Sequence, residues 1–150
     1  MIPAARKRVL FVCIGNSCRS QMAEGFARTY GSDVLVPASA GVAPAAIVAP
    51  DTLRAMDEKN IDLRDHFPKS LRHLERVDFD LVINMTGFFL PEKFNGRVVD
   101  WEVADPVSMD YEEHCAIRDA IERLVMKLIL ELRVAPRAQF RGQGSGRLEL

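Results

Sequence analysis

Eight consecutive residues, Cys13 to Ser20, combine the residue types that a covalent attack on an oxyanion requires. The segment reads Cys-Ile-Gly-Asn-Ser-Cys-Arg-Ser, so a thiol is followed at fixed spacing by an arginine and a serine. The thiolate is the nucleophilic form of cysteine, and the planar guanidinium of Arg19 can hold two anion oxygens at once. The hydroxyl of Ser20 can donate to the thiolate of Cys13. The spacing therefore predicts one loop that both binds an oxyanion and attacks it.

The other residues of this loop suit an anion cradle. Gly15 and Asn16 are residue types that accept positive φ, which a loop needs if it turns its backbone amides toward one point. We expect these amides, with the dipole of a helix from Gln21, to bind the anion. The predicted substrate-binding residues are Ile14, Gly15, Asn16, Ser17, Cys18 and Arg19. The alternative is that Cys13 is only a small buried hydrophobic residue at the end of a strand.

A strand and a helix must position this loop. Residues 9–12 are apolar in succession, as in a strand buried on both faces, and apolar residues at helical spacing follow up to a stop at Gly31. Further strands are expected at 34–36, 81–85 and 97–101, and helices at about 50–59 and 110–133. Strands alternating with helices predict the α/β class, a three-layer sandwich with helices on both faces of a four-stranded parallel sheet. Sites in such folds lie at the carboxyl ends of the strands.

Composition and charge exclude several classes of protein. The chain has 150 residues, with 20 Lys and Arg against 21 Asp and Glu. This near-neutral balance argues against a broad nucleic-acid face, and three cysteines favour the reducing cytoplasm over a secreted disulfide framework. The longest uncharged run, residues 34–50, is too short for a membrane span. We expect a cytoplasmic protein with neither a nucleic acid nor a membrane as partner.

The domain organisation is simple. Residues 1–136 are predicted to form one domain, and residues 137–150 a flexible tail, because the Gly- and Arg-containing end has no apolar periodicity. The tail includes the sequence Gly-Gln-Gly-Ser-Gly, but no strand precedes it and no helix can follow it, so it is not expected to bind phosphate.

The segment from Cys13 to Ser20 matches the C-x5-R-S loop of the low-molecular-weight protein tyrosine phosphatases and of the arsenate reductases that share their fold. The resemblance covers about residues 9–132, and residues 21–26 look like the reductase branch. Ser39-Ala40-Gly41 resembles the family motif in which the serine supports the loop asparagine, here Asn16. The resemblance implies that Asp105, before Pro106, is the general acid and later the base.

The two branches of this family differ in the fate of the cysteine adduct. Water hydrolyses it in a phosphatase, whereas in a reductase a second thiol attacks the nucleophilic sulfur and releases arsenite. In thioredoxin-linked reductases the resolving thiols follow the third strand, where residues 81–89 here include Thr86 and no cysteine. Cys18 resembles a cysteine that forms a reversible disulfide with the nucleophile, and simple loop packing is the other interpretation. Cys115 is expected to pack or to lie on the surface.

The sequence also allows predictions about a metal ion and about the histidines. Family reductases bind a potassium ion through residues that resemble Asn16, Glu24 and Ser39, but Lys69 stands where a further acidic partner is expected. We therefore predict no metal and no cofactor. The histidines at positions 66 and 73 are expected to be solvated or to cap a helix.

Because no cysteine stands near Thr86, we expect a cysteine-dependent phosphatase that hydrolyses phosphate monoesters through a phosphocysteine, on phosphotyrosine in proteins or on small aryl phosphates. The alternative is an arsenate reductase that uses the same loop with an external thiol. A second alternative is a non-catalytic module that binds phosphate or phosphoproteins. The expected partners are thus a phosphorylated protein or a small phosphate or arsenate oxyanion, with a thiol reductant in the second case.

Overall fold

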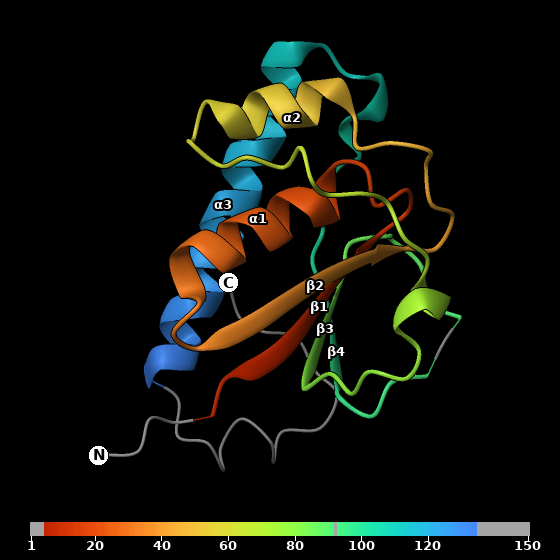
Figure 1. Cartoon of the computed structure of the whole chain (residues 1–150), viewed down its shortest axis with the longest axis vertical. Coiled ribbons are helices and arrows are strands. Elements are labelled where there is room, and N and C mark those ends of the chain that lie inside the picture. Colours follow the sequence, from red (N-terminus) through yellow and green to blue (C-terminus); the bar gives the residue numbers. More distant parts are fainter. Residues whose placement is uncertain (1–4, 92, 135–150) are drawn as a thin grey trace.

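A parallel sheet of four strands organises the protein (Figure 1). The computed structural model describes residues 5–91 and 93–134. The strands are β1 (Lys7–Cys13), β2 (Leu35–Gly41), β3 (Leu81–Asn84) and β4 (Arg97–Asp100), in the spatial order β2-β1-β3-β4. The α-helices are α1 (Arg19–Gly31), α2 (Pro50–Asp57) and α3 (Tyr111–Val134). The predicted α/β class with a four-stranded parallel sheet is confirmed.

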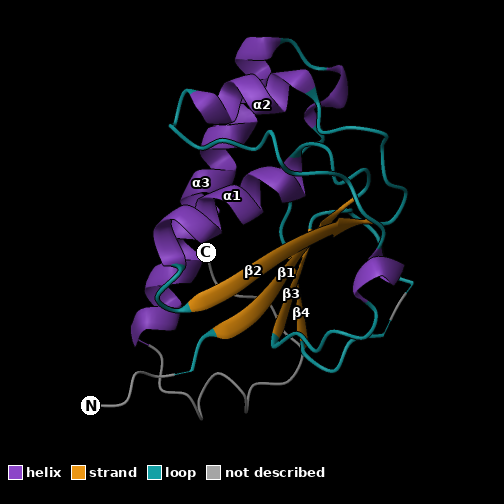
Figure 2. Ribbon diagram, viewed as in Figure 1, coloured by secondary structure: helices purple, strands orange, loops and turns teal. Residues whose placement is uncertain are grey.

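Different elements cover the two faces of the sheet. On one face α1 and α3 pack side by side (Figure 2), where Met22, Phe26, Ile121 and Leu128 form one buried cluster with Phe11 of β1. The other face is covered by the short 3₁₀ helix η1 (Leu71–Leu74) and by loops, in a smaller buried cluster. The central strand β1 is therefore apolar on both faces, which explains its uninterrupted run of apolar residues.

Strand β2 is longer than the sequence indicates. It pairs with β1 from Leu35 to Gly41, in a register that places Gly41 beside Cys13. Pro37 is tolerated because β2 is an edge strand, where a missing backbone donor removes no bond from a central ladder. Ser39, Ala40 and Gly41 are the last three residues of this strand, beyond the end at residue 36 that the sequence predicts.

The helix ends follow recognisable local rules. At the start of α3 the Asp110 carboxylate accepts from the amide of Glu113 at 2.8 Å, and the Glu113 carboxylate accepts from the amide of Asp110 at 3.3 Å, which is a reciprocal capping box. Helix α1 ends at Gly31 as predicted, but for a packing reason. A Cβ there would lie 2.7 Å from Ile129 of α3, so glycine allows the two helices to approach closely.

The predicted boundary at residue 136 and the predicted tail at 137–150 lie outside the described residues. Within the described part of the chain, the helices are all too short or too polar to cross a lipid bilayer.

Gly41 offers a direct test of how closely β2 approaches the loop after β1. A Cβ at this position would lie 2.7 Å from the carbonyl oxygen of Ile14 and 2.9 Å from the amide of Asn16. We expect Gly41→Ala to lower the free energy of unfolding by about 1–3 kcal/mol, because the clash is with backbone. Gly15→Ala is the matched control, since its Cβ would meet nothing closer than 3.7 Å. Urea unfolding measures both, and an equal loss in the two variants would contradict the prediction.

Candidate active site

The segment Cys13 to Ser20 lies at the carboxyl end of β1, between β2 and β3. From β1 the chain continues to β2 on one side of it and then crosses to β3 on the other side, so the strand order reverses at β1. In parallel α/β sheets, ligand crevices form at the carboxyl ends of the strands at such a point. Cys13 is the last residue of β1 and is buried, and α1 begins at Arg19. The strand, loop and helix predicted from the sequence are thus in place.

The loop leaves its backbone donors free while its backbone acceptors are bonded. All six carbonyls of residues 13–18 accept protein hydrogen bonds, five of them from backbone amides at 2.9 to 3.2 Å. Four of those donors, Val42, Ala43, Ala45 and Ala49, come from the segment after β2. In the described part of the chain, the amides of residues 14–19 have no protein acceptor, and Cys18 gives α1 no side-chain cap. Unpaired amides at a helix N-terminus are what an oxyanion requires.

The predicted backbone geometry holds at one of two positions. Asn16 has a φ of 50°, in the left-handed region that asparagine tolerates better than most residues. Gly15 does not adopt a positive φ, so only Asn16 makes the turn.

The thiol of Cys13 is held by a serine that is itself oriented. The Sγ of Cys13 lies 2.9 Å from the Oγ of Ser20, and the same Oγ accepts from the Asn16 side chain at 2.7 Å. Because Asn16 occupies an acceptor site of Ser20, the serine proton is left to point at the sulfur. A hydroxyl that donates to sulfur stabilises the thiolate over the thiol.

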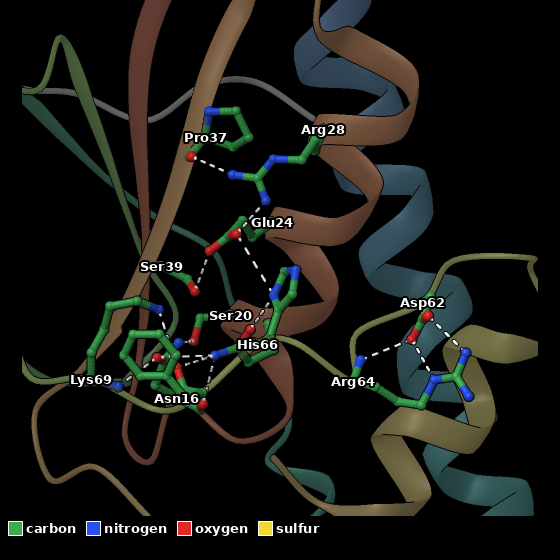
Figure 3. A network of polar contacts seen from close by, with 12 residues as sticks. Asn16, Ser20, Glu24, Arg28, Pro37, Ser39, Asp62, Arg64, His66 and Lys69 are labelled. Carbon is green, nitrogen blue, oxygen red and sulfur yellow. Dashed lines mark hydrogen bonds and ion pairs between the residues drawn. The ribbon is translucent and has the colours of Figure 1, made fainter. Parts of the chain in front are cut away.

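A buried polar network fixes the side chain of Asn16 (Figure 3). Its Oδ1 accepts from the backbone amide of Lys69 at 3.0 Å and from Gln21 at 3.1 Å. The Oε1 of Gln21 lies 2.8 Å from His66 Nδ1. A series of hydrogen bonds through Gln21, Asn16 and Ser20 therefore links His66 to the thiol of Cys13. The expected solvated or capping role of His66 is therefore wrong. The sequence held no local signal for this contact, because His66 lies in an irregular segment far from the loop along the chain.

Ser39 does not contact Asn16 as the resemblance implied. Its hydroxyl donates to Oε1 of Glu24 at 2.7 Å, while Oε2 of Glu24 accepts from Arg28 at 2.6 Å (Figure 3). The reason is that Lys69 and Gln21 already occupy Oδ1 of Asn16. Ser39 thus anchors β2 to α1 and supports the loop only through these elements.

The surroundings of Glu24 do not fit the potassium ion of the family reductases. Both carboxylate oxygens have partners, and the positive charges of Arg28 and Lys69 face the same group. A further cation would be repelled, and no step of the chemistry is assigned to one. Within the described residues, no three His, Cys, Asp or Glu side chains are grouped as metal ligands.

Arg19 connects the loop with two other segments. The side chain is buried, and its NH1 donates to the carbonyls of Met85 at 2.5 Å and Val103 at 2.9 Å. Its NH2 lies 3.5 Å from Oδ2 of Asp105, so the structure brings the predicted acid to the loop. Among the described residues the buried Nε of Arg19 has no partner, and an unpaired buried donor is costly unless a ligand satisfies it.

Asp105 is positioned by its own turn. Its Oδ1 accepts from the amide of Val107 at 3.1 Å, and the residue caps the 3₁₀ helix η2 (Pro106–Ser108). The side chain is about 38% exposed, which allows it to exchange protons with solvent. Asp105 therefore faces Arg19 from the rim of the site.

Thr86, at the position where the resemblance places a resolving cysteine in thioredoxin-linked reductases, is part of the turn after β3. Its hydroxyl donates to Oδ1 of Asn84 at 2.6 Å, and its own oxygen accepts from the amide of Phe88 at 3.2 Å. The residue is buried. It closes a tight turn and offers no nucleophile.

A buried hydrogen bond joins α2 to α3. The hydroxyl of Thr52 in α2 lies 3.0 Å from Nε2 of His114 in α3. Burial raises the pKa of the Cys18 thiol, and the bond from Thr52 offsets this in part. The sequence did not reveal the bond between Thr52 and His114, because the two residues lie 62 positions apart.

Cys115 is a half-buried residue between α2 and α3, in agreement with the packing or surface position expected. Its thiol donates to Glu58 at 3.7 Å and accepts from Arg118 at 3.7 Å. Neither partner belongs to the loop of Cys13.

The fold and the loop place the chain in a known enzyme family. Residues 8–138 match the family described as "Low molecular weight phosphotyrosine protein phosphatase". The chain belongs to this family.

Its relatives include members of both branches. A glutaredoxin arsenate reductase from Synechocystis sp. is 33% identical over 130 residues, which are 84% of this chain and 98% of that protein. A solved structure of an arsenate reductase in the phosphate binding state has a TM-score of 0.77 at 33% identity, over 84% of this chain and 98% of the other. A low molecular weight protein tyrosine phosphatase from T. tengcongensis has a TM-score of 0.69 at 30% identity, over 83% and 99% of the two chains.

The prediction of a phosphatase is wrong. The curated relatives at 30–33% identity over most of the chain are named arsenate reductases. The missing cysteine near Thr86 does not decide between the branches, and the reductase-like residues that follow the loop are the better guide. Both branches bind a tetrahedral oxyanion, so the cradle itself does not separate them.

The environment of His114 predicts a pH dependence of stability. Burial lowers its pKa below the ordinary value of about 6.5, although the bond to Pro106 and the charges of Asp51 and Asp105 oppose this. Below pH 6.5 the unfolded chain therefore binds the proton more readily, and stability is lost as the pH falls through the folded pKa. We expect His114→Gln to lose less free energy of unfolding than wild type between pH 7 and 5. Urea unfolding at the two pH values measures this, and an equal loss in both proteins would contradict it.

Proposed function

We propose that this protein reduces arsenate to arsenite by forming an arsenic adduct on Cys13. The observation that carries the proposal is the loop of residues 13–19, in which a serine-bonded thiol stands beside amides that have no acceptor within residues 5–91 and 93–134. Arsenate and phosphate have similar charge and shape, so this cradle fits either anion. The reductase names of the relatives favour arsenate as the substrate.

Each residue of the loop has a role in this proposal. The amides of residues 14–19 and the free Nε of Arg19 bind three arsenate oxygens. The thiolate of Cys13, stabilised by Ser20, attacks arsenic. Asn16 is a positioning residue, because it orients Ser20. A thiol then attacks the sulfur of Cys13, and arsenite leaves with the electron pair of the sulfur–arsenic bond.

Asp105 is proposed to donate the proton that allows an arsenate oxygen to leave as water. The carboxyl group caps η2 and faces Arg19 at 3.5 Å. Its contact with Arg19 holds it at the edge of the anion site, and its partial exposure lets it be reprotonated after each turnover. Regeneration requires a thiol reductant. The name of one relative points to glutaredoxin as a donor to test first.

Arsenite formation from arsenate tests the proposed function. We expect the wild-type protein to turn over arsenate with glutaredoxin and glutathione, or with thioredoxin, and Cys13→Ser to form no arsenite. The control is Cys115→Ser, which removes a thiol bonded to Glu58 and Arg118 and should retain activity. Arsenite is measured by chromatography with arsenic detection. If the wild type forms none with any thiol donor, the proposal is wrong.

The role of Asp105 has its own test. Positioned general acids contribute about 10²–10⁴-fold, so we expect Asp105→Asn to slow formation of the Cys13 adduct by at least about 100-fold. Rapid quenching under single-turnover conditions measures this step apart from thiol exchange. Binding of inorganic phosphate should change little, because Asp105 is not one of the anion donors. A loss of less than tenfold would remove Asp105 as the acid.

A further inference from the structure

We propose that Asn84 is a positioning residue for Arg19, and that it acts through the peptide bond between Met85 and Thr86. Asn84 is the last residue of β3, which lies beside β1 in the sheet. The inference rests on the proposed role of Arg19 in binding an oxyanion, and it names the group that sets the direction of the guanidinium. It concerns how tightly the anion is held and not the fate of the adduct.

The side chain of Asn84 is buried and uses all of its hydrogen-bonding capacity. Its Oδ1 accepts from the amide of Thr86 at 3.0 Å and from the hydroxyl of Thr86 at 2.6 Å. Its Nδ2 donates to the carbonyl of Phe88 at 2.8 Å and to Oδ1 of Asp100 in β4 at 3.2 Å. A carboxamide offers two donors and two acceptor positions. The four bonds therefore hold the side chain in one orientation.

The bond from the amide of Thr86 to Asn84 fixes the direction of a carbonyl. The N–H of Thr86 and the C=O of Met85 belong to one peptide group, which is trans. In a planar trans peptide these two groups point in opposite directions. Because Oδ1 of Asn84 accepts from the N–H, the carbonyl points away from Asn84, and it accepts from Nη1 of Arg19 at 2.5 Å. Asn84 and Arg19 thus bond to opposite sides of the same peptide group.

The turn around this peptide keeps it in place. The hydroxyl oxygen of Thr86 accepts from the amide of Phe88 at 3.2 Å. Gly87 between them has a φ of 87°, a conformation that glycine adopts without strain. On the other side, the amide of Met85 donates to a carbonyl of β1 at 2.8 Å. Rotation about the bond between Cα and the carbonyl carbon of Met85 would redirect that carbonyl, and the two bonds from Thr86 to Asn84 oppose this rotation.

The direction of the Met85 carbonyl matters because of what Arg19 must present to the anion. Nη1 of Arg19 is shared between the carbonyls of Met85 and Val103. The guanidinium is planar and rigid, so holding Nη1 also sets the direction of Nε. Nε is the buried donor that finds no acceptor among the described residues, and it is the one proposed to bind an oxygen of the substrate. Asn84 therefore affects the anion without touching it.

Two variants of Asn84 test this role. Asn84→Ala and Asn84→Ser remove nearly the same volume, but serine keeps an oxygen that can accept from the amide two residues further on. We expect Asn84→Ala to weaken the binding of inorganic phosphate by at least about tenfold, because a displacement of about 1 Å in a positioning group can cost this much or more. Asn84→Ser should recover most of the affinity. Isothermal titration calorimetry measures both, and equal affinities of the two variants would overturn the inference.

A second background separates positioning of Arg19 from general support of the loop. Arg19→Met keeps the length of the side chain and removes its donors, so phosphate is bound by the loop amides alone. The two Asn84 variants should then differ by less than about twofold, because groups that act through one another do not have additive effects. An NMR titration with phosphate measures these weaker affinities. A difference as large as in the presence of Arg19 would exclude the route through the guanidinium.

Asn95→Ala is the matched control for the loss of an asparagine. Its side chain is exposed and donates to Asp78 at 3.3 Å, so the variant should bind phosphate as the wild type does. Circular dichroism and urea unfolding establish that all variants are folded.

The failure of this inference differs from the failure of the proposed function. If the wild type binds phosphate but forms no arsenite with any thiol donor, the proposed function is wrong, and the two Asn84 variants still decide the role of Asn84. If the wild type reduces arsenate and the two variants bind phosphate equally well, arsenate reduction stands and the role of Asn84 is excluded.

Discussion

The structure depends on keeping the amides of residues 14–19 free of protein acceptors. A buried loop normally satisfies donors and acceptors together. Here all six carbonyls of residues 13–18 are bonded, whereas the amides of residues 14–19 find no acceptor among the residues that the structure describes. The segment from Val42 to Ala49 makes this asymmetry possible, because it supplies four of the donors. This segment follows directly from β2, so the length and register of β2 are constraints on the anion site. At Gly41 the strand β2 contacts the anion loop directly, since a side chain at this position would clash with the backbone of the loop.

The same constraint explains why Arg19 is tied to other segments. A guanidinium in a buried loop must be held without being neutralised, and carbonyl oxygens do this better than a close carboxylate would. The carbonyls of Met85 and Val103 hold one nitrogen, while Asp105 approaches another only to 3.5 Å. Arg19 thereby joins the ends of β1, β3 and the segment after β4 into one site. The unpartnered Nε is the donor left for substrate.

The sequence predicts what is local along the chain. The order of thiol, arginine and serine, the strand before them and the helix after them all lie within residues 7–31, and the structure contains them as predicted. Contacts across the chain could not be predicted in this way. Neither the backbone donors Val42 to Ala49 nor the link from His66 through Gln21 leaves a pattern in residue type. Ser39 was assigned to Asn16 by resemblance, and the competing bonds of Lys69 and Gln21 to Asn16 were not visible.

The branch of the family could not be predicted from the sequence for a related reason. The absence of a cysteine after β3 is not decisive, because the chemistry requires only a thiol that can reach Sγ of Cys13. Distance in space and access to a base decide this, and both depend on tertiary structure. Cys18 and Cys115 are indistinguishable as residue types, yet Cys18 is buried in the same cluster as Cys13, whereas the thiol of Cys115 bonds to Glu58 and Arg118. An absent residue excludes a mechanism only when no other residue of the fold can perform the same step.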